Sequence, residues 1–320
     1  MSRIHEALQR AAERTDDGSL AEPAADAHAF GDLAGEAFPV ELAEARRERQ
    51  SSSQAPQVAA ISTHWPAPPP ADHRPAAHDP RPLSFELIDA RYAGKIVADS
   101  EMSPGSREQY RRLAATLHHA QADKGLKLIM LTSAAMGEGK TLTSCNLALT
   151  LSESYQKNVL LIDADLRRPA VHTVFKLRTS SGLSEGLMQT NEKTIPVHQI
   201  ASRLAVLAAG RATNDPIAGL TSTRMRRLLN EAREQFDWVI VDTPPVAMLP
   251  DANLLASMVD GAVVVVRAGA TPWDLVQRAV EAIGRERIIG VVLNSVTELD
   301  AASQYMSYYY TERPEASSSR

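Results

Sequence analysis

The sequence predicts an α/β protein in three layers, with helices on both faces of a mainly parallel β-sheet. Three observations indicate this fold. Six short apolar runs follow residue 126, and most are continuous rather than alternating, which is typical of strands buried on both faces. The segments between them are mostly long enough for the crossover helices that parallel strands require. A glycine-rich loop directly follows the first run, so we expect an α/β domain of about 200 residues.

The six runs are expected to form the strands of this sheet. In chain order they are residues 126–133 (LKLIMLTS), 158–165 (NVLLIDAD), 204–210 (LAVLAAG), 238–245 (WVIVDTPP), 261–269 (GAVVVVRAG) and 288–295 (IIGVVLNS). Ahead of the first run, residues 107–117 (REQYRRLAATL) have the spacing of a helix. A second helix is expected over residues 141–153, immediately after the glycine-rich loop.

The rest of the chain divides into segments of different composition. Residues 1–14 predict a short amphipathic helix, which is marginal alone and could either fray or dock to a partner. Residues 15–83 are rich in proline and alanine and poor in large apolar side chains, so we expect a flexible, disordered linker. The folded domain is expected to span residues 84–300, and residues 301–320 form a tyrosine-rich tail.

Composition narrows the function classes. Hydrophobic residues at 44% and charged residues at 23% are ordinary for a globular protein, and a net charge of −5 gives no sign of a nucleic-acid binder. The single cysteine, Cys145, excludes an internal disulfide and fits a reducing compartment. We find neither an apolar run near the ~20 residues that span a bilayer nor a signal-peptide core. We therefore expect a cytoplasmic protein that reaches a membrane only through a partner.

The glycine-rich loop, SAAMGEGKT, has the features of a phosphate site. It fits the pattern G-x-x-x-x-G-K-[ST], except that Ala134 replaces the first glycine. Gly137 and Gly139 would let backbone N–H groups close on phosphate oxygens, and the following helix points its N-terminus at the anion. Lys140 would reach the β- and γ-phosphates, and the Thr141 hydroxyl would ligate Mg²⁺. The alternative, a turn with an incidental lysine, fits poorly between a clear strand and a clear helix.

Acidic residues follow two further strands. Asp163 and Asp165 end one run, and Asp242 ends another. Ligands of open α/β sheets bind at the carboxyl ends of the strands, and a nucleotide's Mg²⁺ needs nearby carboxylates, directly or through water. A single acid at a strand end is often a helix cap. Two such strands beside a phosphate loop exceed what capping explains.

These motifs resemble the bacterial tyrosine kinases of polysaccharide export (the CpsD/CapB type), which are related to the P-loop ATPases of the MinD/ParA group. The matching segments lie between roughly residues 85 and 315: GEGKT, LLIDADLRRP, VIVDTPPV, PDANLLASMVDGAVVVVRAG, GVVLNSV and the tyrosine-rich C-terminus. The start, MSRIHEAL, also looks like members from exopolysaccharide clusters. The family loop commonly lacks the first glycine, so Ala134 is no objection. The resemblance implies a P-loop NTPase fold, with ATP and Mg²⁺ serving a protein-tyrosine kinase.

The same resemblance implies roles for individual residues. The nucleotide loop would comprise Met136, Gly137, Glu138, Gly139, Lys140, Thr141 and Leu142. Asp163 and Asp242 would hold Mg²⁺ with Thr141, largely through water, and Asp163 or Asp165 would help to remove the tyrosine proton. Lys140, Asp163, Asp165 and Asp242 would thus carry the catalysis. Asn294 sits where the related ATPases contact adenine, although its turn preference fits a strand-end turn residue equally well.

The tail would supply the phosphate acceptors. It holds four of the seven tyrosines, Tyr305, Tyr308, Tyr309 and Tyr310. Disordered segments are normally poor in aromatic residues, so a merely disordered aromatic tail is the weaker interpretation. The family further implies phosphorylation in trans within a homo-oligomer, which can be a ring. It also implies a membrane chain-length-determinant (polysaccharide co-polymerase) protein as activator at the inner face of the plasma membrane, and an opposing tyrosine phosphatase. No nucleic-acid partner is expected.

The helix over residues 107–117 bears on the assembly of subunits. In the helix over residues 107–117 the family pattern Glu-x-x-Arg-x-x-Arg helps to hold subunits in a ring, and here Glu108 and Arg111 match but the third position is Ala114. The pair alone is worth only ~0.2–0.5 kcal/mol on a solvated helix.

A MinD/ParA-like switch ATPase that positions a partner is the main rival to the kinase function, but such proteins usually carry a lysine where this chain has Ala135 and lack a tyrosine tail. A second rival is an assembly protein that binds nucleotide without chemistry, against which the complete set of loop and acidic residues argues.

Overall fold

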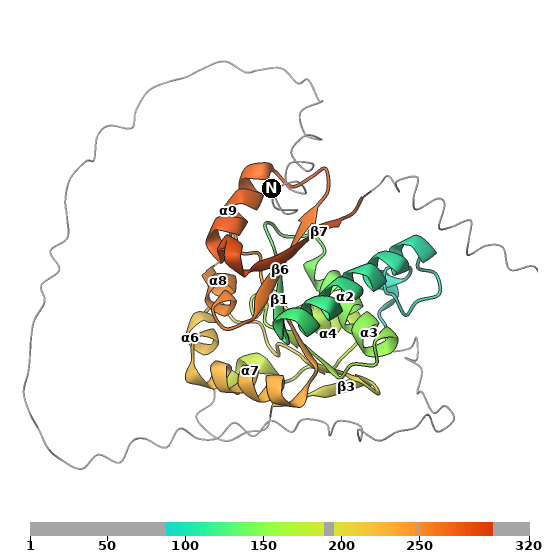
Figure 1. The fold of residues 1–320 in the computed structure, drawn as a ribbon. Helices are drawn as coiled ribbons and strands as arrows, with labels where there is room; N and C mark the ends of the chain where they lie inside the picture. The colour runs from blue at the N-terminus through green and yellow to red at the C-terminus, as the bar shows by residue number, and fades with distance from the viewer. Residues whose placement is uncertain (1–87, 189–194, 249, 297–320) are drawn as a thin grey trace, which may run out of the picture.

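The computed structural model describes residues 88–188, 195–248 and 250–296, which form a seven-stranded sheet with helices on both faces (Figure 1). The strand order is β3-β4-β2-β5-β1-β6-β7, and every neighbouring pair is parallel except β3 with β4. The strands are β1 Leu128–Ser133, β2 Val159–Asp163, β3 His198–Ala201, β4 Leu204–Leu207, β5 Trp238–Asp242, β6 Gly261–Arg267 and β7 Ile288–Asn294. Each of the six predicted runs contains a strand, and β3 is an addition.

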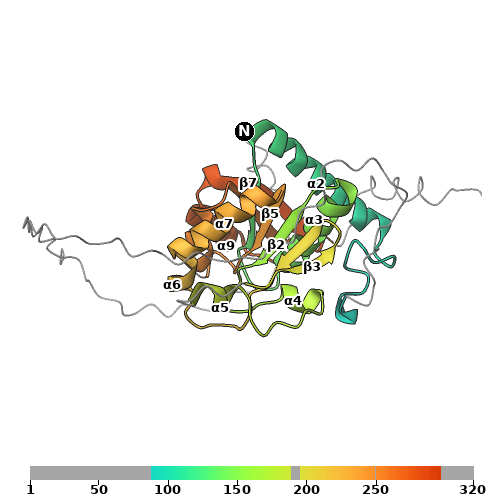
Figure 2. The same ribbon diagram turned by 90° about the horizontal axis from the view of Figure 1, so that it is seen from below.

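The helices divide between the two faces of the sheet, as Figure 2 shows from below. One face is covered by η2 (Ala90–Tyr92), α2 (Pro104–Lys124), α3 (Lys140–Ser154) and α4 (Val171–Val174). The other is covered by α5 (Leu183–Met188), α6 (Ile217–Leu220), α7 (Thr223–Gln235), α8 (Pro250–Ala256) and α9 (Trp273–Ile283), with η3 (Arg285–Arg287) following α9. The predicted three-layer architecture is confirmed.

Burial on both faces explains the continuous apolar runs. In β1, Leu128 and Met130 belong to the core on the α7–α9 side, whereas Ile129 and Leu131 belong to the core on the α2–α3 side. Successive side chains of a strand point to opposite faces, so a strand covered on both sides needs apolar residues at every position.

Helix α2 is longer than the predicted 107–117 segment because its ends carry their own signals. The Ser103 hydroxyl accepts a hydrogen bond from the Ser106 amide, Pro104 occupies the first turn, and Gly125 ends the helix with φ of 68°. Its inner face packs Ala114 into the core beside α3. Where the kinase family carries the third residue of its ring pattern, this chain therefore has a buried alanine.

The Glu108–Arg111 ion pair forms on the outer face of α2, with 3.5 Å between Arg111 Nη1 and Glu108 Oε2. The predicted helix over residues 1–14, the linker over 15–83 and the tail over 301–320 lie outside the described residues. Within the described ranges, we find no helix whose length and apolar character would suffice to cross a membrane.

Candidate nucleotide and phosphoryl-transfer site

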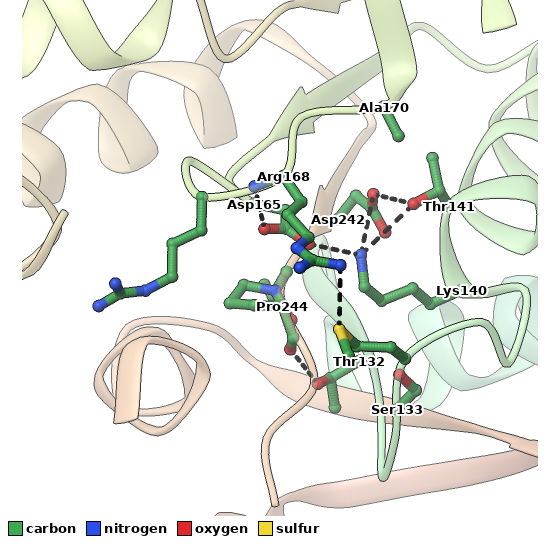
Figure 3. Close-up of polar contacts among 12 residues, drawn as sticks. Thr132, Ser133, Lys140, Thr141, Asp165, Arg168, Ala170, Asp242 and Pro244 are labelled. Atoms are coloured by element: carbon green, nitrogen blue, oxygen red, sulfur yellow. Dashed lines mark hydrogen bonds and ion pairs between the residues drawn. The ribbon is translucent and has the colours of Figure 1, made fainter. Parts of the chain in front are cut away.

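Four of the predicted site residues, Lys140, Thr141, Asp165 and Asp242, meet where β1, β2 and β5 end (Figure 3). These strands are neighbours in the sheet, and Asp163 lies directly opposite Asp242 in the β2–β5 register. The loop after β1 leads into α3, which begins at Lys140. Parallel strands bring their carboxyl ends to one edge, so residues 25 to 101 positions apart in the chain become a single cluster.

The loop between β1 and α3 has the backbone form that anion binding needs. Gly137 and Gly139 both have positive φ, 79° and 88°, which side-chain-bearing residues rarely adopt. A Cβ atom at Gly139 would in addition collide with the amide of Asn294. Gly139 caps α3 without any side-chain hydrogen bond, so the first N–H groups of this 15-residue helix lack a side-chain cap. Such N–H groups suit a phosphate oxygen.

Lys140 lies between two carboxylates. Its Nζ is 2.9 Å from Asp165 Oδ2 and 3.7 Å from Asp242 Oδ2, and only 12% of its side chain is exposed. Burial by itself lowers the pKa of the amine, but Asp242 and Asp165 outweigh this effect and raise the pKa of Lys140 above its usual value. The lysine is therefore held in its charged form at the end of the phosphate loop.

Asp242 is a fully buried carboxylate of the cluster. Its Oδ2 accepts a hydrogen bond from the Thr141 hydroxyl at 2.7 Å, and its Oδ1 accepts one from the Ser144 hydroxyl at 3.1 Å. Burial raises the pKa of Asp242, while Lys140 opposes this shift. Ser144 was not among the predicted site residues, although its place one turn beyond Lys140 on α3 was a signal.

Asp163 supports the loop that follows β2. Its Oδ1 accepts from the Asp165 amide at 3.2 Å, and its Oδ2 accepts from the amides of Ala170 and Val171, each at 3.1 Å. Burial and the neighbouring charge of Asp242 raise the pKa of Asp163 to about 8. Of the two acids in this motif, Asp165 is the one that contacts Lys140.

The donor set fits a hard divalent cation. The Thr141 hydroxyl contacts the carboxylate of Asp242, which lies opposite Asp163 in the sheet, and oxygen ligands of this kind are those that Mg²⁺ prefers. Among the described residues, no three or more His, Cys, Asp or Glu side chains form a metal site by themselves. This is expected of Mg²⁺ in P-loop proteins, where one or two protein ligands act together with water and phosphate oxygens.

The two arginines that follow Asp165 were predicted only as part of a family motif. Arg168 donates its amide to Asp165 Oδ1 at 3.0 Å, and its guanidinium lies 3.4 Å from the sulfur of Met136 in the phosphate loop (Figure 3). Arg167 turns away to an ion pair with the buried Asp251, 2.6 Å between Nε and Oδ2. Arg168 thus borders the site, and Arg167 joins its loop to α8.

The remaining residues singled out from the sequence are Cys145, Asn294 and the four tail tyrosines. Cys145 is fully buried on α3, where it is a packing residue, and burial raises the pKa of its thiol well above the usual value. Asn294 donates its amide to the carbonyl of Glu138 at 2.8 Å, and its side-chain oxygen accepts from the Ser295 amide at 2.9 Å. Its contact with adenine stays a prediction. The four tail tyrosines lie outside the described residues.

The fold and the loop define a P-loop NTPase. Residues 126–317 match the family model of the ParA group, described as "NUBPL iron-transfer P-loop NTPase". Nucleotide binding is the general property of this fold.

More specific similarities identify the family. The tyrosine-protein kinase YwqD of Bacillus subtilis is 35% identical over 226 residues, which are 70% of this chain and 94% of that protein. The crystal structure of the chimerical protein CapA2B2 matches with a TM-score of 0.58 and 30% identity, over 64% of this chain and 91% of the other. The kinase domain of the Escherichia coli tyrosine kinase ETK matches with a TM-score of 0.56 and 28% identity, over 75% and 93%. The chain belongs to the bacterial tyrosine-protein kinases, and its activity is that of a protein-tyrosine kinase.

Proposed function

We propose that this protein is an ATP- and Mg²⁺-dependent tyrosine autokinase whose acceptors are Tyr305, Tyr308, Tyr309 and Tyr310. The observation that carries the proposal is the contact between Lys140 and Asp165 beside the Thr141–Asp242 pair. A cation for phosphoryl oxygens thereby adjoins a carboxylate that can accept a proton. A nucleotide switch without phosphoryl transfer to protein needs no such acceptor for a tyrosine proton.

The geometry supports a task for each side chain in the proposed transfer. Lys140 exchanges Asp165 for the oxygens of the β- and γ-phosphates, and Asp165 is then free to accept a proton. The tyrosine oxygen forms a bond to the γ-phosphorus while the bond from that phosphorus to the β–γ bridging oxygen breaks. The phenolic proton passes to Asp165, and ADP leaves with the bridging oxygen.

The remaining site residues would hold the metal ion and orient the loop that carries Asp165. Thr141 and Asp242 would hold Mg²⁺, with Asp163 acting through water, and the ion when bound neutralises charge on the phosphate oxygens. Asp163 also holds the Ala170 and Val171 amides, so it places the loop that carries Asp165.

We further infer the cellular setting from the resemblance of the sequence to kinases of polysaccharide export. The kinase would act at the inner face of the plasma membrane, recruited and activated by a membrane chain-length-determinant protein, and a tyrosine phosphatase would reverse its reaction. Phosphorylation in trans within a homo-oligomer would regulate polymerisation and export of an exopolysaccharide or capsule. Each phosphate adds about −1.5 to −2 charges to the tail, which favours its release from a neighbour's site.

The test of the proposal mixes two variants that cannot label their own tails. One is Lys140→Met, and the other has all four tail tyrosines replaced by phenylalanine. Phosphotyrosine on the Lys140→Met chain after Mg-ATP supports transfer in trans. Its absence, with both chains folded and associating, would rule out transfer in trans. ATP hydrolysis without any phosphotyrosine in the wild type would instead favour a MinD/ParA-like switch.

A further inference from the structure

The tip of the phosphate loop is held from the side by the ends of β6 and β7. The carboxylate of Glu138 accepts a hydrogen bond from the Ala135 amide at 2.7 Å through Oε2. Its Oε1 accepts a hydrogen bond from the Thr271 hydroxyl and lies 3.5 Å from the Arg267 amide. The carbonyl of Glu138 accepts from the Asn294 amide at 2.8 Å. One residue therefore joins the loop to both neighbouring strand ends.

A carboxylate is energetically unfavourable at this buried position unless hydrogen bonds compensate it. Glu138 is only 3% exposed, and no ion pair to it occurs among the described residues. A buried charge without a cation is unfavourable unless several donors compensate it, and a loop that receives phosphate gains nothing from an adjacent negative charge. The arrangement is accounted for if the hydrogen bonds of the carboxylate are needed to hold the loop.

The turn that carries Thr271 is itself anchored to the sheet. The turn between β6 and α9 is closed by hydrogen bonds from the amides of Ala270 and Thr271 to the Arg267 carbonyl, at 3.3 and 3.2 Å. The Ala268 amide donates to the carbonyl of Asn294 at 2.9 Å. Thr271 consequently presents its hydroxyl from a position that two strands define, and it acts as a firm anchor for the loop.

We propose that Glu138 is a positioning residue. Its hydrogen bond with Thr271, called the lock below, holds the phosphate loop in the conformation that receives the phosphates of a nucleoside di- or triphosphate. This inference rests on the proposed function and adds the turn over residues 267–271 to the nucleotide site. Loop order that already exists before binding does not have to be created by the ligand, so the lock raises nucleotide affinity. Lys140 and Asp165 keep their own contacts when the lock is lost, so the effect falls on binding more than on transfer.

The proposal predicts a different Mg-ADP affinity for each of four variants. Glu138→Ala removes the hydrogen bonds from Ala135 and Thr271 and the contact with the Arg267 amide, and it should weaken Mg-ADP binding about tenfold or more. Thr271→Val removes the hydroxyl alone and should have a smaller effect in the same direction. Because the two side chains act through one contact, the double variant should bind ADP no more weakly than Glu138→Ala. Glu138→Gln keeps an acceptor for Ala135 and offers an N–H to the threonine oxygen, so it should recover part of the affinity.

The experiment measures Mg-ADP affinity by calorimetry on the full chain, together with KM and kcat for autophosphorylation and the melting temperature. Glu234→Ala, an exposed glutamate on α7, is the matched control and should bind like the wild type. A raised KM with a nearly unchanged kcat supports the lock, and a fall in kcat alone would overturn it. Wild-type affinity in Glu138→Ala would also overturn it. If Glu138→Ala does not fold, the inference stands or falls with Thr271→Val, whose wild-type affinity would overturn it.

The same data separate this inference from the proposed function. A wild-type protein that binds ADP but makes no phosphotyrosine contradicts the autokinase proposal, while the order of ADP affinities still decides the lock. A wild-type protein that binds no ADP contradicts both.

Discussion

The ion pair between Arg167 and Asp251 should be a large single contribution to the stability of the loop that carries Asp165. Asp251 is 1% exposed and Arg167 is 27% exposed, and the contact is bidentate, with Nε–Oδ2 at 2.6 Å and Nη2–Oδ1 at 3.2 Å. Arg167 also donates to the carbonyl of Asn214 at 2.7 Å. Removal of one partner from such a pair leaves an uncompensated buried charge, at 3–5 kcal/mol for fully buried pairs. Since Arg167 is partly solvated, we expect Arg167→Ala to lower the free energy of unfolding by about 3 kcal/mol.

This change should lower the melting temperature by roughly 6–12 °C for a domain of this size. The assay is thermal and urea unfolding followed by circular dichroism, with Arg278→Ala as the matched control. Arg278 pairs with Asp274 at 3.4 Å, but both side chains are about two-thirds exposed, so this variant should change the unfolding free energy by less than about 0.5 kcal/mol. The double variant Arg167→Ala/Asp251→Ala should be more stable than Arg167→Ala alone. Equal stability of Arg167→Ala and the wild type would refute the reasoning.

Three other variants or treatments test the site and the core. Lys140→Met should abolish autophosphorylation, as judged by an anti-phosphotyrosine blot, because the cation for the phosphoryl oxygens is lost; wild-type labelling would contradict the assignment. Gly139→Ala should lose most ADP affinity in calorimetry but keep a cooperative melt, because the new Cβ is strained at φ of 88° and collides with Asn294. Cys145 should resist thiol reagents at pH 8 until urea unfolds the protein, since burial raises its pKa and excludes the reagent; rapid labelling of the native protein would disprove its burial.

The strands of the sheet could be predicted where burial leaves a recognisable pattern in the sequence. Strands covered on both faces, such as β1 and β5, are apolar at every position, and continuous runs are easy to recognise. Strand β3 (His198–Ala201) could not be found in this way. It lies at the edge of the sheet, pairs antiparallel with β4, and buries only Ile200 among its four residues.

The candidate site at the strand ends could also be predicted, because the topology of a parallel sheet determines which strand ends meet. Contacts between side chains of distant loops were not. Glu138 reaches Thr271 across 133 positions, and Ser144 reaches Asp242 across 98, so no local pattern relates the partners. Asp163 accepts a hydrogen bond from the loop after β2, whereas Asp165 pairs with Lys140. This difference between the two acids likewise depends on the path of the chain after β2.

The central claim is that Lys140 and Asp165 transfer phosphate to the tail, and phosphosite mapping by mass spectrometry after Mg-ATP tests it most directly. The wild type should carry phosphate on the tail tyrosines and Lys140→Met alone should carry none; the expected sites are Tyr305, Tyr308, Tyr309 and Tyr310. The remaining tyrosines provide an internal control, because Tyr110 on α2 is half-buried against the core and should stay unmodified. An unphosphorylated wild-type tail, or phosphate found mainly on Tyr92, Tyr110 and Tyr155, would contradict the account.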